Sequence, residues 1–493
     1  MPQVVNQPKR ATSHWFILIL LALAQFMVVL DISIVNVALP SIQRAFSLSN
    51  SNLQWLITAY TLAFGGFLLL GGRTADYFGR RITFLSGVSV FALASLATGL
   101  SQSGTMIIIC RAIQGLAAAY MSPAALSIVL VTYREGHERN VALSVWGAVA
   151  SGGAAVGVLF GGIITQYLSW RWNFFINVPV GLFVVIASLK VLHHHKSEAE
   201  RKSLDLPGAI SGTLGLMSLV YALTEAPTYG WTSLRILLCL IAAICLIIFF
   251  VLNEARSKAP LMPLRIFRIR NISGADGLMV FLSAGLFSVF FFTTLYLQNI
   301  LHYTPIRTGL DFLVVPVCIT IVAVNIPRLI KVIGHKPILV VAPLFVSGGL
   351  FWLSQIPVNG NFWANVAPGI MIMGLGMGGM FVSVTIAATS GVPHHEAGLA
   401  SGLLNTAQQV GGAIGLAVLT GILASSSSSY IKSLKLHAAP NATQVAAATV
   451  HGFHDGYLVA STFGLAASLL AIFVIRIQKN KTDPSDKEIT LVA

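Results

Sequence analysis

Two charged residues stand inside long apolar runs of this sequence. Asp31 lies deep in the run that begins at Trp15, and Arg111 lies near the start of the run that begins at Thr105. A charge in an apolar span is costly, so each is a candidate for function. Because a helix rises about 1.5 Å per residue, the two side chains reach depths that agree to within about one turn. An apposed pair is geometrically allowed, although the sequence does not show that the two spans touch.

A carboxylate beside a guanidinium can serve two purposes. Burial favours the neutral form of a carboxyl group, whereas a nearby cation favours its charged form. A group under both influences can gain or lose a proton when its partner moves, so Asp31 would titrate and Arg111 would bias the titration. The alternative is a fixed ion pair that locks two helices together. We favour the titrating role, which a proton-coupled cycle requires.

Further candidates lie in the second half of the chain. Asp311 lies just inside a span, one turn from Arg307. It could attract a cationic ligand or pair with Arg307, and we favour the pairing slightly. Aromatic and methionine side chains could line a substrate cavity, with core packing as the alternative for each. These residues are Phe287, Phe291, Met373 and Met377.

Glycine recurs every four residues in one span. Gly153, Gly157 and Gly161 share one helical face, and Gly162 is adjacent. Such a flat stripe lets another helix approach closely. We interpret it as a helix-packing surface.

Motifs of enzymes, metal sites and ATP-driven pumps do not occur. The sequence has no HExxH, no P-loop lysine motif and no GxSxG. Its four cysteines lie in apolar runs without CxxC or Cys/His spacing, so we expect neither a disulfide nor a metal site. We therefore expect no enzyme and no cofactor, and, if the protein pumps, an ion gradient as the energy source.

Membrane-spanning helices must position these residues. The 493 residues are 56% hydrophobic and 9% charged, whereas soluble domains are about 25% charged. Apolar runs of the roughly 20 residues needed to cross the hydrocarbon core recur along the whole chain. The fourteen predicted spans are 15–38, 52–72, 82–101, 105–131, 141–166, 173–192, 207–226, 234–253, 273–301, 308–330, 338–356, 363–388, 397–424 and 456–477.

Basic residues set the predicted orientation. With the N-terminus in the cytoplasm, most of the 30 Lys and Arg residues fall in cytoplasmic segments, as the positive-inside rule requires. We therefore attribute the formal charge of +14 to basic loops and not to a nucleic-acid surface. Both termini are expected in the cytoplasm.

Two hydrophilic, basic stretches divide the chain. They predict an all-α polytopic membrane protein with two six-helix bundles and two inserted helices. The predicted segments are a cytoplasmic N-terminus (1–14), the first bundle (15–192), a linker (193–206), the inserted pair (207–253), a second linker (254–272), the second bundle (273–477) and a cytoplasmic tail (478–493). The stretch 424–457 is predicted to be a long loop on the outside.

Four local motifs occur in a fixed order. They are LDISIVNVALPSI at 30–42, GRTADYFGRR at 72–81, RAIQG at 111–115 and GVLFGG at 157–162. By their order and spacing, the sequence resembles the major facilitator superfamily, specifically its fourteen-span drug:proton antiporter branch. The resemblance covers roughly residues 15–477. The last motif departs from the family pattern, which has Pro where this chain has Val158.

The resemblance implies roles for the motif residues. Asp31 would be the coupling carboxylate and Arg111 its electrostatic partner. A cytoplasmic gate would form around the second motif, where Asp76 could dock on a helix N-terminus, which favours an anion. The gate residues would be Gly72, Asp76, Gly79, Arg80 and Arg81. Val158 keeps the close packing of its motif but removes the bend that Pro would favour.

We therefore expect a secondary active transporter that exports small amphiphilic, cationic compounds in exchange for protons, as in multidrug efflux. An exporter of one metabolite, siderophore or lipid is an alternative on the same fold, as is a non-transporting sensor. The expected location is a bacterial inner membrane. The expected partners are a small-molecule substrate and the lipid bilayer, without nucleic acid, and a monomer is compatible with the sequence.

Overall fold

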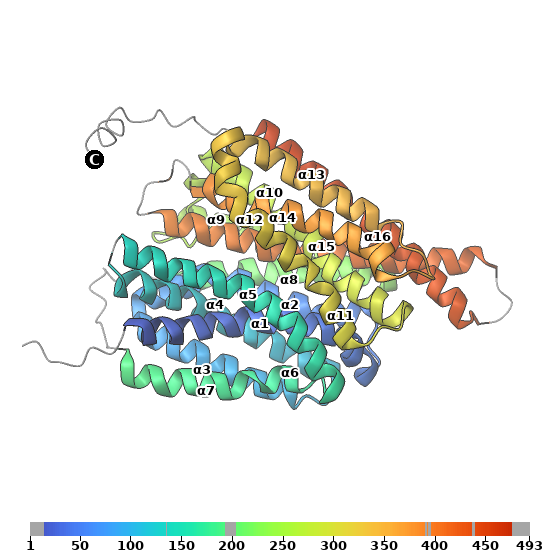
Figure 1. Cartoon of the computed structure of the whole chain (residues 1–493), viewed down its shortest axis with the longest axis horizontal. Helices are drawn as coiled ribbons and strands as arrows, with labels where there is room; N and C mark the ends of the chain where they lie inside the picture. Colours follow the sequence, from blue (N-terminus) through green and yellow to red (C-terminus); the bar gives the residue numbers. More distant parts are fainter. Residues whose placement is uncertain are drawn as a thin grey trace, which may run out of the picture.

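The structure, a computed structural model, describes residues 14–134, 136–192, 204–389, 392, 396–435 and 439–475. All regular structure within these residues is helical (Figure 1). Fourteen helical stretches are long and apolar enough to cross a membrane, which confirms the predicted polytopic α-helical fold. Most of the predicted N-terminal segment and of the linker 193–206, and all of the tail 478–493, lie outside the described residues.

The helices follow one another along the whole chain. Their bounds are α1 (His14–Phe46), α2 (Asn50–Phe78), α3 (Arg80–Gly99), α4 (Gly104–Thr132), α5 (His137–Tyr167), α6 (Trp172–Phe175), α7 (Asn177–Val191), α8 (Leu206–Tyr229), α9 (Leu234–Arg256), η1 (Leu264–Arg268), α10 (Arg270–Leu295), η2 (Tyr296–Ile300), α11 (Pro305–Phe312), α12 (Val314–Ile333), α13 (His335–Leu353), η3 (Phe362–Val366), α14 (Ala367–Thr389), α15 (Ala397–Ser433) and α16 (Ala442–Phe473).

Local sequence signals set the helix ends. The side chains of Ser49, Ser103 and Ser233 each accept a hydrogen bond from a backbone N–H in the first turn of the following helix. Each bond satisfies a donor that the helix itself leaves unpaired. Gly79 joins α2 to α3 with a φ of 98°, a conformation that glycine adopts without steric cost. These two helices therefore reverse direction over a single residue.

The helices run between two ends of the molecule. We call the end where α1 begins at His14 and α2 ends at Phe78 the basic face; it lies on the left of Figure 1. We call the end where α1 ends at Phe46 and α15 ends at Ser433 the opposite face; it lies on the right.

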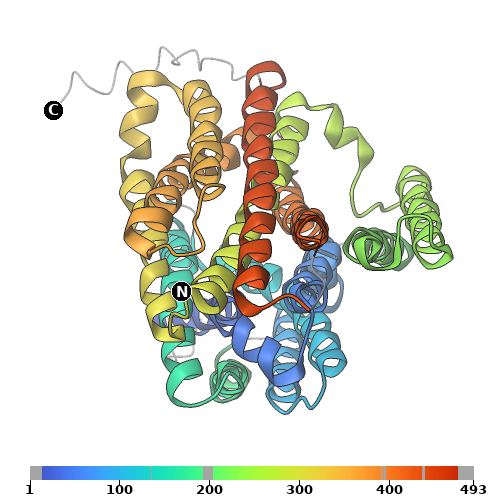
Figure 2. The same cartoon turned by 90° about the vertical axis from the view of Figure 1, so that its right-hand side faces the viewer.

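The inserted pair sits at the seam between two bundles. Helices α1 to α7 form the first bundle and α10 to α16 form the second, with α8 and α9 to one side (Figure 2). Helix α8 packs against both α2 and α15, whereas α9 packs on α8. The Gln54 side chain on α2 donates a hydrogen bond to Thr224 on α8. An apolar cluster that includes Leu62, Val220 and Ala417 joins the three helices, so α8 contacts both bundles.

Polar contacts join the two bundles at the opposite face. Nε2 of Gln298 donates to the carbonyl oxygen of Val37 at 2.9 Å. The N–H of Ile306 donates to Oε1 of Gln166 at 3.2 Å. Residues of α1, α5, η2 and α11 thus hold the two bundles together at this end in the present conformation.

The longest predicted loop is helical in the structure. Helix α15 continues to Ser433 and α16 begins at Ala442, so the predicted loop over 424–457 is wrong. The serine run disfavours a helix on its own, but Ser426 donates a hydrogen bond to Asp455 across the hairpin. Asn441 caps α16 in a reciprocal pairing with Gln444. Tertiary contacts therefore extend both helices past the predicted boundary.

Candidate functional site

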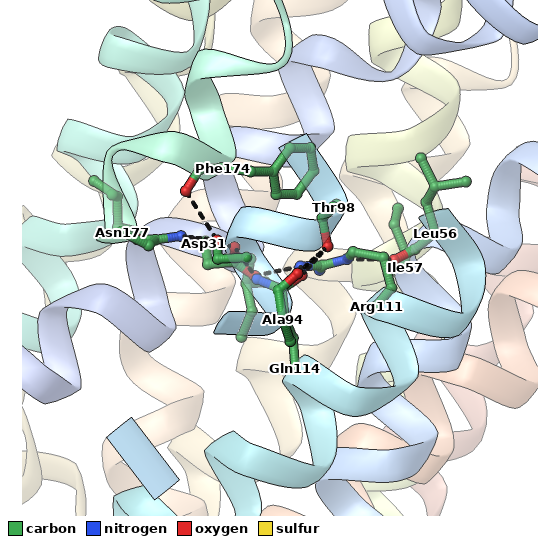
Figure 3. Close-up of polar contacts among 12 residues, drawn as sticks. Asp31, Leu56, Ile57, Ala94, Thr98, Arg111, Gln114, Phe174 and Asn177 are labelled. Atoms are coloured by element: carbon green, nitrogen blue, oxygen red, sulfur yellow. Dashed lines mark hydrogen bonds and ion pairs between the residues drawn. The ribbon is translucent and has the colours of Figure 1, made fainter. Parts of the chain in front are cut away.

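Helices of the first bundle position the buried charge pair. Asp31 lies on α1 and Arg111 on α4, and their exposed fractions are 0% and 1%. Nη1 of Arg111 donates to Oδ2 of Asp31 in an ion pair (Figure 3). The structure thus brings together the two charges that the sequence placed at similar depths.

Two amides hold the other carboxylate oxygen. Nε2 of Gln114 on α4 and Nδ2 of Asn177 on α7 each donate to Oδ1 of Asp31 at 3.1 Å. Oε1 of Gln114 accepts from Nη1 of Arg111 at 3.2 Å, which closes the network (Figure 3). Neither amide was predicted from the sequence. The position of Gln114, one helical turn from Arg111, could have indicated it, whereas Asn177 has only its polarity to distinguish it.

Two hydroxyl groups of α3 form hydrogen bonds with the side chains of Asn177 and Gln114. Nδ2 of Asn177 also donates to Oγ of Ser95 at 3.0 Å, and that hydroxyl donates to the carbonyl of Phe174 at 2.9 Å. Oγ1 of Thr98 donates to Oε1 of Gln114 at 3.2 Å. The donors to Asp31 are therefore oriented by groups on neighbouring helices.

The buried guanidinium of Arg111 has further partners besides Asp31. Its Nε donates to the carbonyl oxygen of Leu56 on α2 at 3.0 Å. The rings of Tyr60 and Phe174 lie 4.4 Å and 5.9 Å from the guanidinium carbon, within reach of a cation–π interaction. Helix α4 approaches α2 this closely because residue 115 is glycine, and a Cβ there would overlap the backbone of Tyr60.

Both carboxylate oxygens of Asp31 have hydrogen-bond donors in this conformation. Asp31 has no exposed surface and accepts hydrogen bonds from three side chains. A buried charge without partners is expensive, so each of these three donors stabilises the Asp31 carboxylate. Within the described ranges, no group of three His, Cys, Asp or Glu side chains could hold a metal ion.

The predicted gate residues lie around the α2–α3 turn at the basic face. They are Gly72, Asp76, Gly79, Arg80 and Arg81. Nη2 of Arg80 lies 3.9 Å from Oδ1 of Asp76, and both side chains are exposed. Nη2 of Arg81 donates to the carbonyl of Leu189 on α7 at 2.7 Å. The docking of Asp76 on a helix N-terminus stays a prediction.

A neighbouring arginine joins the gate region to the second half of the chain. The guanidinium of Arg73 donates to the carbonyl oxygens of Ala259 and Pro260. These two residues lie between α9 and η1, in the segment that leads into the second bundle.

Asp76→Ala should shift the balance between conformations open to either face. If Asp76 closes the basic face, its loss should raise the reactivity of single cysteines there about fivefold, since a contact with a helix end is worth up to about 1 kcal/mol. Cysteines at the opposite face should become less reactive. Labelling with a membrane-impermeant maleimide measures both, with Glu138→Gln as a control at the same face. Unchanged reactivity on both faces would contradict a gate role.

The glycine stripe of α5 faces α1. A Cβ built on Gly153, Gly157 or Gly161 would come within 3.3 Å of atoms of α1. The two helices therefore contact each other almost backbone to backbone, as a small-residue stripe allows. Gly162 instead faces the second bundle, where a Cβ would lie 2.6 Å from the carbonyl oxygen of Pro305.

Val158 packs at the same interface. Its side chain is 4% exposed and lies in an apolar cluster with Val37 and Phe312. A Cβ on Gly309 of α11 would overlap the carbonyl oxygen of Val158. Helix α5 is continuous from His137 to Tyr167 with valine at this position, and the glycines around it preserve close contact with both α1 and α11.

Gly162→Ala should weaken closure at the opposite face. The added methyl group would meet the carbonyl of Pro305 and Cα of Ile306, at 2.6 Å and 2.8 Å, and backbone atoms cannot rotate away. Overpacking of this kind costs about 1–3 kcal/mol, so single cysteines at this face should become at least about fivefold more reactive. Gly152→Ala is the matched control because no atom lies within 4 Å of a Cβ there. Equal reactivity of the two variants would contradict the prediction.

The predicted cavity residues fall into two groups. Phe291 and Met373 are fully buried in the core of the second bundle, so they present no surface to a substrate in this conformation. Met377 is 5% exposed and borders a small gap inside the same bundle. Phe287 is partly buried and packs over Gly412 of α15. Core packing explains the placement of Phe291 and Met373 better than cavity lining does.

Asp311 lies on α11 without the predicted ion pair. Its Oδ2 is buried and has no hydrogen-bond partner among the described residues. The guanidinium carbon of Arg307 lies 3.6 Å from the ring centroid of Tyr303 instead. The charge of Arg307 still acts on Asp311 from this position, so the favoured Asp311–Arg307 pairing stays a prediction.

Comparisons with known proteins agree with this architecture. Residues 21–416 match the family model of the Major Facilitator Superfamily. The chain is 38% identical to a puromycin resistance protein of Streptomyces alboniger, over 96% of this chain and 93% of that protein. It is 35% identical to a cephamycin export protein of Amycolatopsis lactamdurans, over 85% and 87%. It is 36% identical to a tetracenomycin C resistance and export protein of Streptomyces glaucescens, over 83% and 76%.

Solved structures share the fold. A bacterial homologue of the human lysosomal transporter Spinster, in an inward-facing conformation, aligns with a TM-score of 0.69 at 13% identity, over 95% of this chain and 98% of that chain. The xylose transporter of E. coli aligns with a TM-score of 0.60 at 14% identity, over 95% and 98%. At these identities the likeness concerns the fold alone.

The family match, the relatives and the fourteen spans lead to one assignment. The protein is a multi-pass membrane transporter of small molecules and not an enzyme. The chain belongs to the Major Facilitator Superfamily, in its fourteen-span branch of drug-resistance and export proteins.

Proposed function

We propose that the protein exports small amphiphilic, cationic compounds across the plasma membrane in exchange for protons. The sealed network around Asp31 carries this proposal. Its carboxylate has no exposed surface and depends on donors from α4 and α7. A titratable group in such a place can exchange a proton only when the helices move, and this is the link that coupling requires.

The proposed cycle alternates access between the two faces. Deprotonated Asp31 favours loading of the substrate from the cytoplasm. Protonation from the outside weakens the pairing with Arg111 and the binding of the substrate, which leaves. Arg111 keeps its bond to the Leu56 carbonyl and its contact with Tyr60 meanwhile. The scheme works only if substrate binds the two conformations unequally, because equal binding shifts no equilibrium.

We assign the basic face to the cytoplasm. Arg73, Arg80 and Arg81 cluster at the end of α2 and the start of α3, as the positive-inside rule requires of a cytoplasmic turn. Both chain termini would then be cytoplasmic. The bond from Gln298 to the Val37 carbonyl would help to close the outer side in this conformation. The proton gradient supplies the energy, so no cofactor is needed.

Export of one natural product is the second candidate. Two relatives carry names that refer to the export of a single compound, cephamycin or tetracenomycin C. A dedicated exporter would keep the Asp31 network and differ in the walls of its cavity. A panel of cationic, zwitterionic and anionic compounds distinguishes the two candidates by the breadth of transport.

Transport in proteoliposomes tests the proposal. Purified protein is reconstituted, a pH gradient is imposed, and accumulation of ethidium is followed by fluorescence. We expect accumulation that a protonophore abolishes. Accumulation unaffected by the protonophore would rule out proton coupling. Binding of ethidium without any flux would favour a sensor on a transporter fold.

A further inference from the structure

A pocket opens at the opposite face, away from the Asp31 network. It lies between α8 of the inserted pair and the α15–α16 hairpin, and its volume is about 640 Å³. Figure 2 shows α8, α15 and α16 next to one another on this side of the molecule. Leu223 of α8 and Val418 and Ile422 of α15 contribute apolar walls. Pockets of about 300–1,000 Å³ with mainly apolar walls and a few polar groups are typical of small-molecule sites.

One carboxylate faces this pocket. Asp455 of α16 lines it, and its side chain is 43% exposed. Its Oδ2 accepts a hydrogen bond from Ser426 and lies 3.6 Å from Nδ1 of His451. The described residues that line the pocket include no lysine and no arginine, and Asp455 is the one acidic residue among them. The carboxylate therefore favours a cation.

Aromatic rings strengthen this preference. Trp231 and Tyr430 line the pocket, and the Tyr430 ring centroid lies 5.0 Å from that of His451. Trp and Tyr rings attract cations to their faces. Trp231 is 56% exposed and is placed at the helix end, a depth that Trp prefers in membranes.

The pocket is polar at one end and apolar at the other. Val418 precedes Ser426 by two helical turns on α15, so the apolar wall and the carboxylate cluster are separated by about 12 Å along the helix. The polar end lies toward the tip of the hairpin at Ser433. This arrangement matches an elongated molecule with a charged head and an apolar body.

We propose that this pocket binds an amphiphilic organic cation, with its charged head beside Asp455 and its apolar body against Leu223 and Ile422. The site lies on the inserted pair and the second bundle, whereas Asp31 lies in the first bundle, so the two sites are separate. The proposal does not depend on proton-coupled export. It gives α8 a role in ligand binding beyond its packing at the seam.

Protection of a cysteine in the pocket tests the proposal. Ser429→Cys places a thiol in the wall, and its alkylation by a membrane-impermeant maleimide is quantified at that residue by mass spectrometry. The full-length protein is used in phosphatidylglycerol nanodiscs, with tetraphenylphosphonium as the probe. We expect the probe to slow alkylation. Asp455→Asn should raise the concentration for half-protection about tenfold, and Asp455→Glu should restore most of the protection.

Controls at the same face keep the test specific. The probe should not protect Thr228→Cys, which is exposed on α8 outside the pocket. Glu225→Gln removes a carboxylate that does not line the pocket and should leave the protection of Ser429→Cys unchanged. Absence of protection at Ser429→Cys, or equal protection in Asp455→Asn, would overturn the proposal.

The charged head could belong to a dissolved compound or to a lipid. Alkylation of Ser429→Cys in phosphatidylcholine nanodiscs without the probe distinguishes these sources. Protection there that Asp455→Asn abolishes would identify the choline headgroup as an occupant of the site. Protection by tetraphenylphosphonium alone would identify a dissolved cation. Neither measurement requires transport or a functional Asp31.

Discussion

Asp31→Asn should reduce proton-driven accumulation of a cationic dye in proteoliposomes to the level of empty vesicles. Asn is nearly isosteric with Asp and can still accept hydrogen bonds from Gln114 and Asn177, but it cannot bind and release a proton. The loss of transport should therefore be complete even in variant protein that is shown to be folded. The measurement is initial dye accumulation under an imposed pH gradient, with thermal unfolding as a check on folding.

Two further variants sharpen the test of Asp31. Asp31→Glu retains a titratable carboxyl group and should keep part of the activity. Glu225→Gln removes a different carboxylate, near the end of α8, and should transport at the wild-type rate. Proton-coupled transport by Asp31→Asn at the wild-type rate would leave the ion pair with a structural role only.

Arg111→Met should destabilise the protein by about 3–5 kcal/mol, because it leaves the buried Asp31 carboxylate without its counter-charge. Its amide donors remain, but they carry no net charge. The loss should appear as a lower unfolding temperature in detergent. Met fills much of the arginine volume, so cavity formation contributes little.

The double variant Asp31→Asn/Arg111→Met isolates the charge effect. It removes both charges and should recover most of the stability that Arg111→Met loses. A double variant as unstable as Arg111→Met would show that the loss comes from packing against Tyr60 and Phe174. Arg44→Met, which removes an exposed arginine at the end of α1, should change stability by less than about 1 kcal/mol.

Most of the fold could be predicted because the bilayer imposes a strong constraint. A span needs roughly 20 apolar residues, so every predicted span overlaps a helix of the structure. Helix ends were less predictable, since they depend on tertiary contacts. Helix α15 continues to Ser433 because Ser426 donates a hydrogen bond to Asp455 on α16. No local sequence pattern predicts that contact.

Of the residues in the Asp31 network, only the charged ones could be predicted from the sequence. Asp31 and Arg111 stand out because charges are rare inside apolar spans. Asn177 is essential to the geometry, yet a neutral polar residue in a span has many possible partners. The surroundings of Arg307 were equally hard to predict, because sequence spacing does not show that its guanidinium lies over the Tyr303 ring.

Release of protons on substrate binding tests the central claim most directly. A cationic dye is added to the purified protein in weakly buffered detergent solution, and the pH change is recorded for the wild type and for Asp31→Asn. If Asp31 couples substrate to protons, the wild type should release protons on binding the dye and Asp31→Asn should release none. Dye binding by the wild type without proton release would contradict the account.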